Sequence, residues 1–171
     1  MAKTGLIRVL LADDHTIVRQ GLRSALESYP NIEVVGEVGD GDEAVAAAAR
    51  LQPSVVVMDI HMPKMDGVTA TRLIKAQHPE IVVVGLSADR KHYQVHAMQK
   101  AGAFEVLHKD HAVTELYAAI QRAVASTQPI LILEDTLAAA ESLAELEESG
   151  GPNSPGEESK EATERESDSE K

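Results

Sequence analysis

Residues 55–67 have the sequence VVVMDIHMPKMDG. The first four, Val55 to Met58, form an unbroken apolar and largely β-branched run, which is typical of a strand buried on both faces. The run ends on the carboxylate of Asp59, and Pro63 and Gly67 follow soon after. A buried parallel strand that carries an Asp at its carboxyl end places that side chain in the crevice where open α/β sheets bind ligands. The pattern therefore predicts a functional site centred on Asp59.

Apolar runs alternate with amphipathic segments on both sides of this stretch, between residues 6 and 125. We expect strands at 6–12, 32–38, 55–59, 81–86 and 104–107, and helices at 16–27, 43–51, 67–77, 89–100 and 111–125. Units of about 20–30 residues in strict alternation are typical of βαβ crossovers and a parallel sheet. Glu33, Gly36 and Glu37 interrupt the second strand, which is typical of an edge. The sequence therefore predicts an α/β fold, a doubly wound (flavodoxin-like) five-stranded parallel sheet of order 2-1-3-4-5.

The end of the chain differs in composition from the rest. Residues 130–171 contain 13 of the 28 acidic residues but only three of the 16 basic ones, so most of the net charge of −12 lies there. We expect one domain over residues 1–128, an extra amphipathic helix over 129–149 and a disordered acidic tail over 150–171. The extra helix could pack on the domain or bind a partner or a second copy, and we expect the first.

The composition argues against several classes of protein. The chain has no Cys, which excludes a disulfide scaffold and thiolate metal sites. No stretch approaches the roughly 18 apolar residues of a membrane span, and the N-terminal apolar run is too short for a signal peptide. Phosphate backbones require a cationic surface, which an acidic chain does not offer. We therefore expect a soluble cytoplasmic protein that binds neither membrane nor nucleic acid directly.

Three acids are expected to converge at the carboxyl edge of the sheet. Asp13 and Asp14 follow the first strand, and Asp59 ends the third, which is its neighbour in the predicted order. Like charges about 4 Å apart repel by roughly 4 kcal/mol at an effective dielectric near 20, so such a trio requires a cation or raised pKa values. Oxygen ligands open to solvent suit Mg²⁺. The alternative is that Asp13 and Asp14 only cap the following helix, which does not account for the third acid.

Two further polar residues are expected at the same edge. Ser87 follows the fourth strand, and Lys109 follows the fifth. Alone, the serine would be a turn residue and the lysine a solvated charge. Together beside the acids, a hydroxyl and an ammonium are what a phosphoryl group needs, one as hydrogen-bond donor and one as point charge.

Four segments in this order resemble the motifs of two-component response-regulator receiver domains: Leu11-Ala12-Asp13-Asp14-His15, residues 58–67, Leu86-Ser87-Ala88 and Leu107-His108-Lys109-Asp110. The resemblance covers about residues 6–125. It is strongest to the subgroup that usually carries a helix-turn-helix output domain, but no basic helix-turn-helix follows residue 125.

The resemblance implies a role for each residue of the acidic site. Asp59 would be the phosphoacceptor, attacking a phosphohistidine of a sensor kinase to form an acyl phosphate. Mg²⁺ would be bound by Asp14, Asp59 and the backbone carbonyl of His61, with Asp13 assisting through water. Lys109 would pair with the phosphoryl oxygens. In addition, Ser87 would move to bond the phosphate and so start the conformational switch.

Some positions depart from the family pattern. Val106 stands three residues before the lysine, where the family commonly has an aromatic, which argues against an aromatic switch coupled to Ser87. His61 and Asp89 occupy positions that tune phosphate lifetime in the family. Asp110 follows the lysine where a proline in a cis peptide is common, so we expect no cis bond there.

We therefore expect a phosphoacceptor response regulator that acts through protein contacts, without a DNA-binding domain and without enzymatic activity beyond its own phosphoryl transfer and autodephosphorylation. Its partners would be a sensor histidine kinase or phosphotransfer protein and a downstream protein. The downstream protein would bind the fourth helix, fifth strand and fifth helix, with residues 90–93 as contacts. Homodimer formation on phosphorylation is left open. The alternatives are a Mg²⁺-dependent phosphohydrolase with an aspartyl-phosphate, in which His61 replaces the usual second acid, and a receiver scaffold that takes no phosphate.

Overall fold

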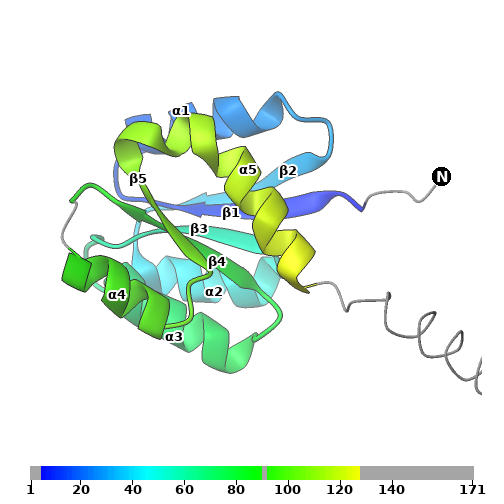
Figure 1. The fold of residues 1–171 in the computed structure, drawn as a ribbon. Helices are drawn as coiled ribbons and strands as arrows, with labels where there is room; N and C mark the ends of the chain where they lie inside the picture. Colours follow the sequence, from blue (N-terminus) through cyan, green and yellow to red (C-terminus); the bar gives the residue numbers. More distant parts are fainter. Residues whose placement is uncertain (1–4, 90–91, 128–171) are drawn as a thin grey trace, which may run out of the picture. The chain divides into compact units, whose positions relative to one another are not determined.

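The computed structural model describes residues 5–89 and 92–127. The extra helix and acidic tail expected beyond residue 128 lie outside these ranges. Five strands alternate with five helices in the described part of the chain (Figure 1). In order they are β1 (Ile7–Ala12), α1 (Thr16–Glu27), β2 (Ile32–Val38), α2 (Gly41–Leu51), β3 (Val55–Asp59), α3 (Gly67–Gln77), β4 (Val82–Ser87), α4 (His92–Lys100), β5 (Glu105–His108) and α5 (Lys109–Thr127).

The five strands form one parallel sheet of order β2-β1-β3-β4-β5. This confirms the predicted doubly wound architecture and its strand order. The edge position predicted for residues 32–38 is also confirmed, because β2 pairs with β1 alone in this sheet. Strands β1 and β3 are neighbours at the centre, with Ala12 opposite Met58, so their carboxyl ends lie side by side.

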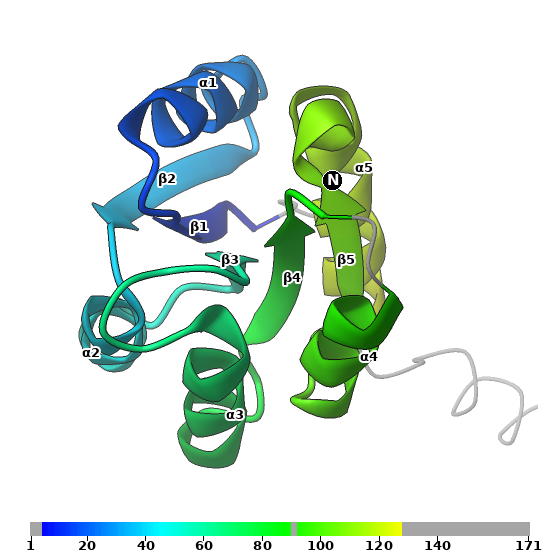
Figure 2. The ribbon, with the colours of Figure 1, turned by 90° about the vertical axis from the view of Figure 1, so that its left-hand side faces the viewer.

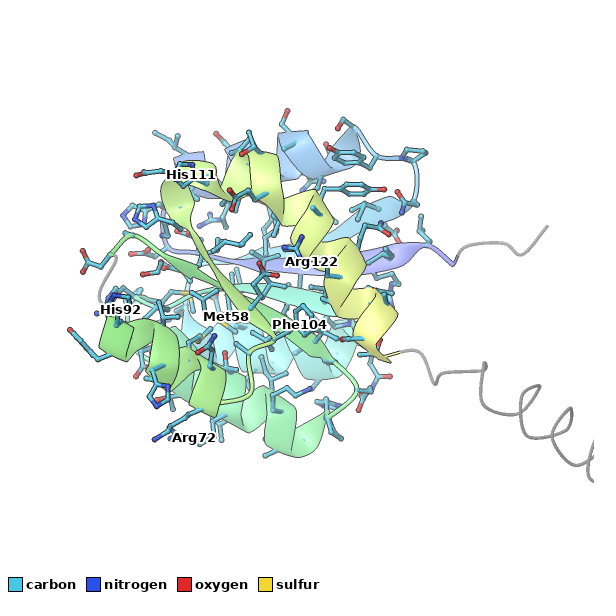
Figure 3. The ribbon with its side chains drawn as sticks, in the orientation of Figure 1. Met58, Arg72, His92, Phe104, His111 and Arg122 are labelled. Atoms are coloured by element: carbon cyan, nitrogen blue, oxygen red, sulfur yellow. The ribbon has the colours of Figure 1, made fainter. Side chains whose placement is uncertain are left out.

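Helices cover both faces of the sheet: α1 and α5 lie on one face, and α2, α3 and α4 on the other (Figure 1). The alternation along β3 shows how one strand serves both layers. Val55 and Val57 belong to the core under α1 and α5, whereas Val56 and Met58 belong to the core under α2, α3 and α4. Met58 accordingly lies in the middle of the molecule in Figure 3. All five residues of β3 are buried, as the apolar run predicts.

Three helix starts differ from the expected positions. Helix α2 starts at Gly41 because Asp40 caps it, its side chain accepting from the backbone N–H of Glu43 at 2.8 Å. Helix α5 starts at Lys109, so this residue begins a helix instead of lying in a loop. Helix α4 is described from His92, and Asp89 lies outside it. Within the described ranges no peptide bond is cis, as expected for Lys109-Asp110, and no helix is long and apolar enough to cross a bilayer.

Candidate functional site

The expected acids lie at the carboxyl edge of the sheet, onto which Figure 2 looks. Asp59 is the last residue of β3, and Asp13 directly follows β1. Gly67, the first residue of α3, packs directly on the end of β3: a Cβ added to it would lie 1.9 Å from the carbonyl oxygen of Asp59. The glycine of the MDG motif therefore allows the loop after β3 to fold back tightly against the strand that presents Asp59.

Asp13, Asp59 and Lys109, which we name the acceptor cluster, form a buried ion-pair group. Lys109 Nζ lies 2.7 Å from Asp13 Oδ2 and 2.8 Å from Asp59 Oδ2. Asp13 and Asp59 are each 1% exposed. Lys109 is the first residue of α5, so the end of β3, the loop after β1 and the start of α5 each supply one of the three charges. The expected convergence of the acids and the lysine is therefore present in the structure.

Burial and the neighbouring charges shift two pKa values in this cluster. Burial raises the pKa of Asp59 above its ordinary value, and repulsion from Asp13 adds to the rise, while the contacts with Lys109 oppose it. Burial lowers the pKa of Lys109, but its contacts with Asp13 and Asp59 outweigh burial, so the pKa lies above its ordinary value. The lysine is therefore held protonated, as a fixed positive charge beside Asp59.

Asp14 and His15 complete an acidic cluster with the two buried aspartates. One ligand atom from each of Asp13, Asp14, His15 and Asp59 lies within 4.8 Å of the others. His15 Nδ1 is 2.8 Å from Asp14 Oδ1, and His15 is the N-cap of α1, with no side-chain cap bond. The alternative in which Asp13 and Asp14 only cap this helix is therefore wrong. The proximity of His15 was not predicted, although it is adjacent to the two acids in sequence.

The charges of this site suit a divalent cation. Three carboxylates against one ammonium leave two negative charges, and the buried Asp13 Oδ2 and Asp59 Oδ2 accept no well-aligned hydrogen bond within the described residues, although they face Lys109. Carboxylate oxygens open to solvent on one side, as Asp14 is, are the ligands that Mg²⁺ uses in proteins. The residues present therefore fit Mg²⁺.

Ser87 ends β4 and is buried, but its hydroxyl is directed to its own loop. Ser87 Oγ donates to the backbone carbonyl of Asp89 at 2.6 Å, and the backbone N–H of Asp89 lies 3.2 Å from the same oxygen. The strand positions Ser87 close to Asp59, because Leu86 pairs with Asp59 in the sheet. The structure thus places Ser87 at the expected edge but does not bond its hydroxyl to the acceptor cluster.

A cavity of about 180 Å³ lies beside Ser87, between β5 and the start of α4. Val106 lines it, at the position where the resemblance leads one to expect an aromatic side chain. The other lining residues are Asp89, His92, Val95, Leu107 and His108. A valine here is too small to fill the space that an aromatic ring could occupy.

His61 lies in the loop after β3 and contacts both the acceptor cluster and α4. Its backbone N–H donates to Asp59 Oδ1 at 3.3 Å, and its ring Nε2 lies 2.8 Å from Nε2 of Gln94. Gln94 is a buried residue of α4. Gln94 was not predicted from the sequence. The sequence signal that could have identified it is its spacing of four residues from Met98, which places a polar side chain on the buried side of α4.

The comparisons with known proteins agree with this geometry. The family model "response regulator receiver domain" matches residues 9–121. The chain belongs to this family. The resemblance of the four sequence motifs to receiver domains is therefore confirmed.

The curated relatives include regulatory proteins and a methylesterase. The chain is 40% identical over 147 residues to the transcriptional regulatory protein LiaR of Bacillus subtilis, covering 85% of this chain and 67% of LiaR. It is 38% identical to the response regulator VraR of Staphylococcus aureus, covering 68% of this chain and 56% of VraR. A protein-glutamate methylesterase of Geobacter metallireducens is 52% identical over 79 residues, only 23% of its length. The chain thus spans only part of the relatives that it matches.

Solved receiver domains have the same fold. The receiver domain of NarL from Mycobacterium tuberculosis matches with a TM-score of 0.67 and 30% identity, over 70% of this chain and 97% of that one. The response regulator domain of CheB from Thermotoga maritima matches with a TM-score of 0.66 and 30% identity, over 72% of this chain and 99% of that one. The matches thus cover these receiver domains almost completely.

Proposed function

We propose that this receiver domain is a phosphoacceptor, phosphorylated on Asp59 by a sensor histidine kinase or a phosphotransfer protein. The observation that carries the proposal is the contact of Lys109 Nζ with both Asp13 and Asp59 at the carboxyl edge of the sheet. Two buried carboxylates on one ammonium are costly to maintain for stability alone. The proposal is also supported by membership of the receiver family, because phosphoryl transfer to an aspartate is the chemistry typical of that family.

In the proposed reaction an oxygen of Asp59 attacks the phosphorus of a phosphohistidine. The P–N bond breaks, the imidazole leaves, and Asp59 carries an acyl phosphate. Lys109 is already in contact with Asp59 Oδ2, so its ammonium is positioned to pair with the phosphoryl oxygens. The backbone N–H of His61 fixes the other carboxylate oxygen, which orients Asp59 for attack. Positioning and charge neutralisation are the main demands of phosphoryl transfer on a protein.

Asp13, Asp14, Asp59 and the backbone carbonyl of His61 would hold Mg²⁺. When bound, the ion supplies positive charge that neutralises the phosphoryl oxygens. Two of these carboxylates are held by the strands that end at the site, and Asp14 lies in the loop after β1. The side chain of Asp14 is 35% exposed, which leaves the site accessible from solvent.

The output would follow through the surface formed by α4, β5 and α5, on which Tyr93 of α4 and Val113 of α5 are exposed, as is Phe104 directly before β5. In Figure 3 His92 and His111, near the starts of α4 and α5, lie at the same edge of the sheet as the acceptor cluster. Ser87 would leave the backbone of Asp89 to bond the phosphoryl group, which would transmit phosphorylation to β4 and to this surface.

The remaining features of the proposal follow the expectations from the sequence. The domain would cover residues 1–128, with the extra helix and the acidic tail after it. The protein would act in the cytoplasm through protein contacts, without binding DNA directly and without turning over an external substrate. Size-exclusion chromatography of the phosphorylated protein would measure whether phosphorylation leads to a homodimer.

The test is phosphorylation by acetyl phosphate and Mg²⁺, followed by intact mass. We expect one phosphoryl group on the wild type, none on Asp59→Asn, and one on Asp110→Asn, a matched change of an exposed acid near the site. Chelation of the metal should reduce incorporation strongly. Unchanged incorporation in Asp59→Asn, or none in the wild type, would contradict the proposal.

A further inference from the structure

Arg19, the fourth residue of α1, reaches back to the loop that carries two acids of the site. Its guanidinium Nη1 donates to the backbone carbonyl of Asp13, and Nη2 donates to Thr16 Oγ1 at 3.3 Å. The side chain is only 17% exposed. Arg19 therefore binds the peptide unit that joins Asp13 to Asp14.

Glu37 of the edge strand β2 pairs with the same guanidinium. Its Oε1 lies 3.8 Å from Arg19 Nε, a buried nitrogen that makes no hydrogen bond within the described residues. The other carboxylate oxygen, Oε2, lies 2.6 Å from Arg23 Nη1, so a second ion pair fixes Glu37. Glu37 thus balances the charge of Arg19 and limits where the guanidinium can lie.

The stability of α1 does not explain the position of this arginine. A cation near the start of a helix faces the positive end of the helix dipole, and the first turn of α1 contains no acidic residue. Burial of most of a charged side chain adds a desolvation cost. Arg19 is therefore better explained by its contact with the loop than by the helix in which it lies.

The guanidinium binds the backbone of Asp13 and not its carboxylate. The backbone N–H of Asp13 donates to the carbonyl of Val38 at 3.1 Å, so Arg19 and Val38 together hold both polar groups of this main-chain position. The carboxylate has other partners: Oδ1 accepts from the backbone N–H of His15 at 2.8 Å, and Oδ2 faces Lys109. Arg19 thus fixes the main chain without occupying the oxygens that would bind a divalent ion.

We propose that Arg19 is a positioning residue for the divalent cation, because its bond to the Asp13 carbonyl holds Asp13 and Asp14 in the arrangement that binds Mg²⁺. The inference rests on the proposed function, to which this ion belongs. Removal of a group that orients metal ligands typically weakens metal binding 10–100-fold. Arg19 acts on a backbone group and not on a ligand oxygen, so we expect the lower end of this range, about tenfold.

The first test is the Kd for Mg²⁺, measured on the unphosphorylated full chain by titration of the amide chemical shifts. Arg19→Met keeps an apolar stem and removes the guanidinium, so the Kd should rise about tenfold. The direction separates positioning from electrostatics, because removal of a positive charge near the acids would by itself strengthen the binding of a cation. Unchanged or tighter binding in Arg19→Met would overturn the inference.

Arg23→Met is the matched control. The hydrogen bonds and ion pairs of Arg23 within the described residues are with Glu27 and Glu37, so its loss removes the same charge without the contact to the loop. Its Mg²⁺ affinity should equal or slightly exceed that of the wild type. The double variant Arg19→Met/Glu37→Gln keeps the net charge and should still bind about tenfold more weakly. An equal loss in Arg23→Met, or wild-type affinity in the double variant, would contradict the role of Arg19.

The second test needs no metal. The backbone N–H of His15 donates to Asp13 Oδ1, so its hydrogen exchange reports how firmly the loop is held. Exchange at His15 should be faster in Arg19→Met and unchanged in Arg23→Met, while the amides of β3 keep their wild-type rates. Unchanged exchange at His15 in Arg19→Met would overturn the inference. An equal acceleration in β3 would do the same, because it would show a loss of global stability instead.

The outcomes separate the two proposals. If the wild type takes up no phosphoryl group from acetyl phosphate, the proposed function fails, but the Mg²⁺ titration needs no phosphate and still decides the role of Arg19. Wild-type Mg²⁺ affinity in Arg19→Met would overturn that role while phosphorylation of Asp59 stands. A wild type that binds no Mg²⁺ would overturn it as well.

Discussion

The acceptor cluster and the region around Ser87 differ in how completely they are assembled. Asp13, Asp59 and Lys109 are in contact, whereas the hydroxyl of Ser87 bonds the backbone of Asp89 and lies beside a cavity lined by Val106. Buried carboxylates require a cation, so electrostatics holds the first group together. The Ser87 hydroxyl is held by the backbone N–H and carbonyl of Asp89. Under the proposed function, the acceptor cluster is therefore preorganised, whereas Ser87 would have to change its hydrogen-bond partners.

The largest expected effect comes from Lys109→Met, which removes the ammonium of the acceptor cluster. The change leaves two buried carboxylates without their ammonium, so we expect a loss of about 3 kcal/mol in the free energy of unfolding, measured by urea denaturation. Arg122→Ala is the control, because it removes a surface ion pair with Glu105. That loss should stay within about 1 kcal/mol. Equal losses of unfolding free energy in Lys109→Met and Arg122→Ala would contradict the special role of the buried acceptor cluster.

The pH dependence of stability should identify the same lysine. The pKa of Lys109 is raised in the folded state, so its contribution is fully present below the ordinary lysine pKa of about 10.4 and is lost as the pH rises through the higher folded value. The difference in unfolding free energy between the wild type and Lys109→Met should hold constant from about pH 7 to 9 and shrink above about pH 10.4. A difference that grows with alkaline pH would have the wrong sign.

Removal of one charge from the cluster should have the opposite effect on stability. The raised pKa of Asp59 means that its ionised form is less favourable in the folded than in the unfolded protein, at every pH above its folded pKa. Asp59→Asn should therefore raise the Tm by a few degrees at neutral pH without added metal, measured by circular dichroism. As the pH falls through the raised pKa, the wild type should recover part of this difference. A lower Tm for Asp59→Asn at neutral pH would contradict the account.

The smallest expected effect is that of Ser87→Ala, because the Ser87 hydroxyl contacts the backbone of Asp89 and not the acceptor cluster. The change removes hydrogen bonds to the backbone of Asp89, for which we expect about 0.5–1.5 kcal/mol of stability. Phosphoryl incorporation by acetyl phosphate should persist, because Ser87 does not contact Asp59. The chemical-shift changes of β4 and α4 on phosphorylation should be reduced. Complete loss of phosphoryl incorporation would contradict this account, because it would mean that phosphorylation of Asp59 requires the Ser87 hydroxyl.

Much of the fold and the acceptor cluster could be predicted from the sequence, because both follow from simple patterns. Residues 55–58 and 81–86 are continuous apolar runs, which identify strands buried on both faces. Once β1 and β3 are neighbours, the carboxyl ends of these strands bring Asp13 and Asp59 together without any knowledge of side-chain packing. The expected position of Lys109 beside them followed from the end of the last strand.

Contacts that depend on packing could not be predicted in the same way. The position of Gln94 against His61 depends on where α4 sits on the sheet, and no local pattern encodes this. The same holds for the Ser87 hydroxyl, which has two possible sets of partners and bonds its own loop. Two helix starts also differ from the predicted positions by two residues, at Gly41 and Lys109. At Gly41 the cap by the Asp40 side chain, and not the apolar periodicity, sets the start.

The most direct test of the convergence of acids and amine is a crystal structure of the protein with Mg²⁺ and the phosphoryl mimic BeF₃⁻. We predict the mimic on Asp59, Mg²⁺ bound by Asp14 and Asp59 with Asp13 nearby, and the ammonium of Lys109 on a fluorine of the mimic. A structure in which Lys109 points into solvent, or in which the mimic binds away from Asp59, would contradict the account.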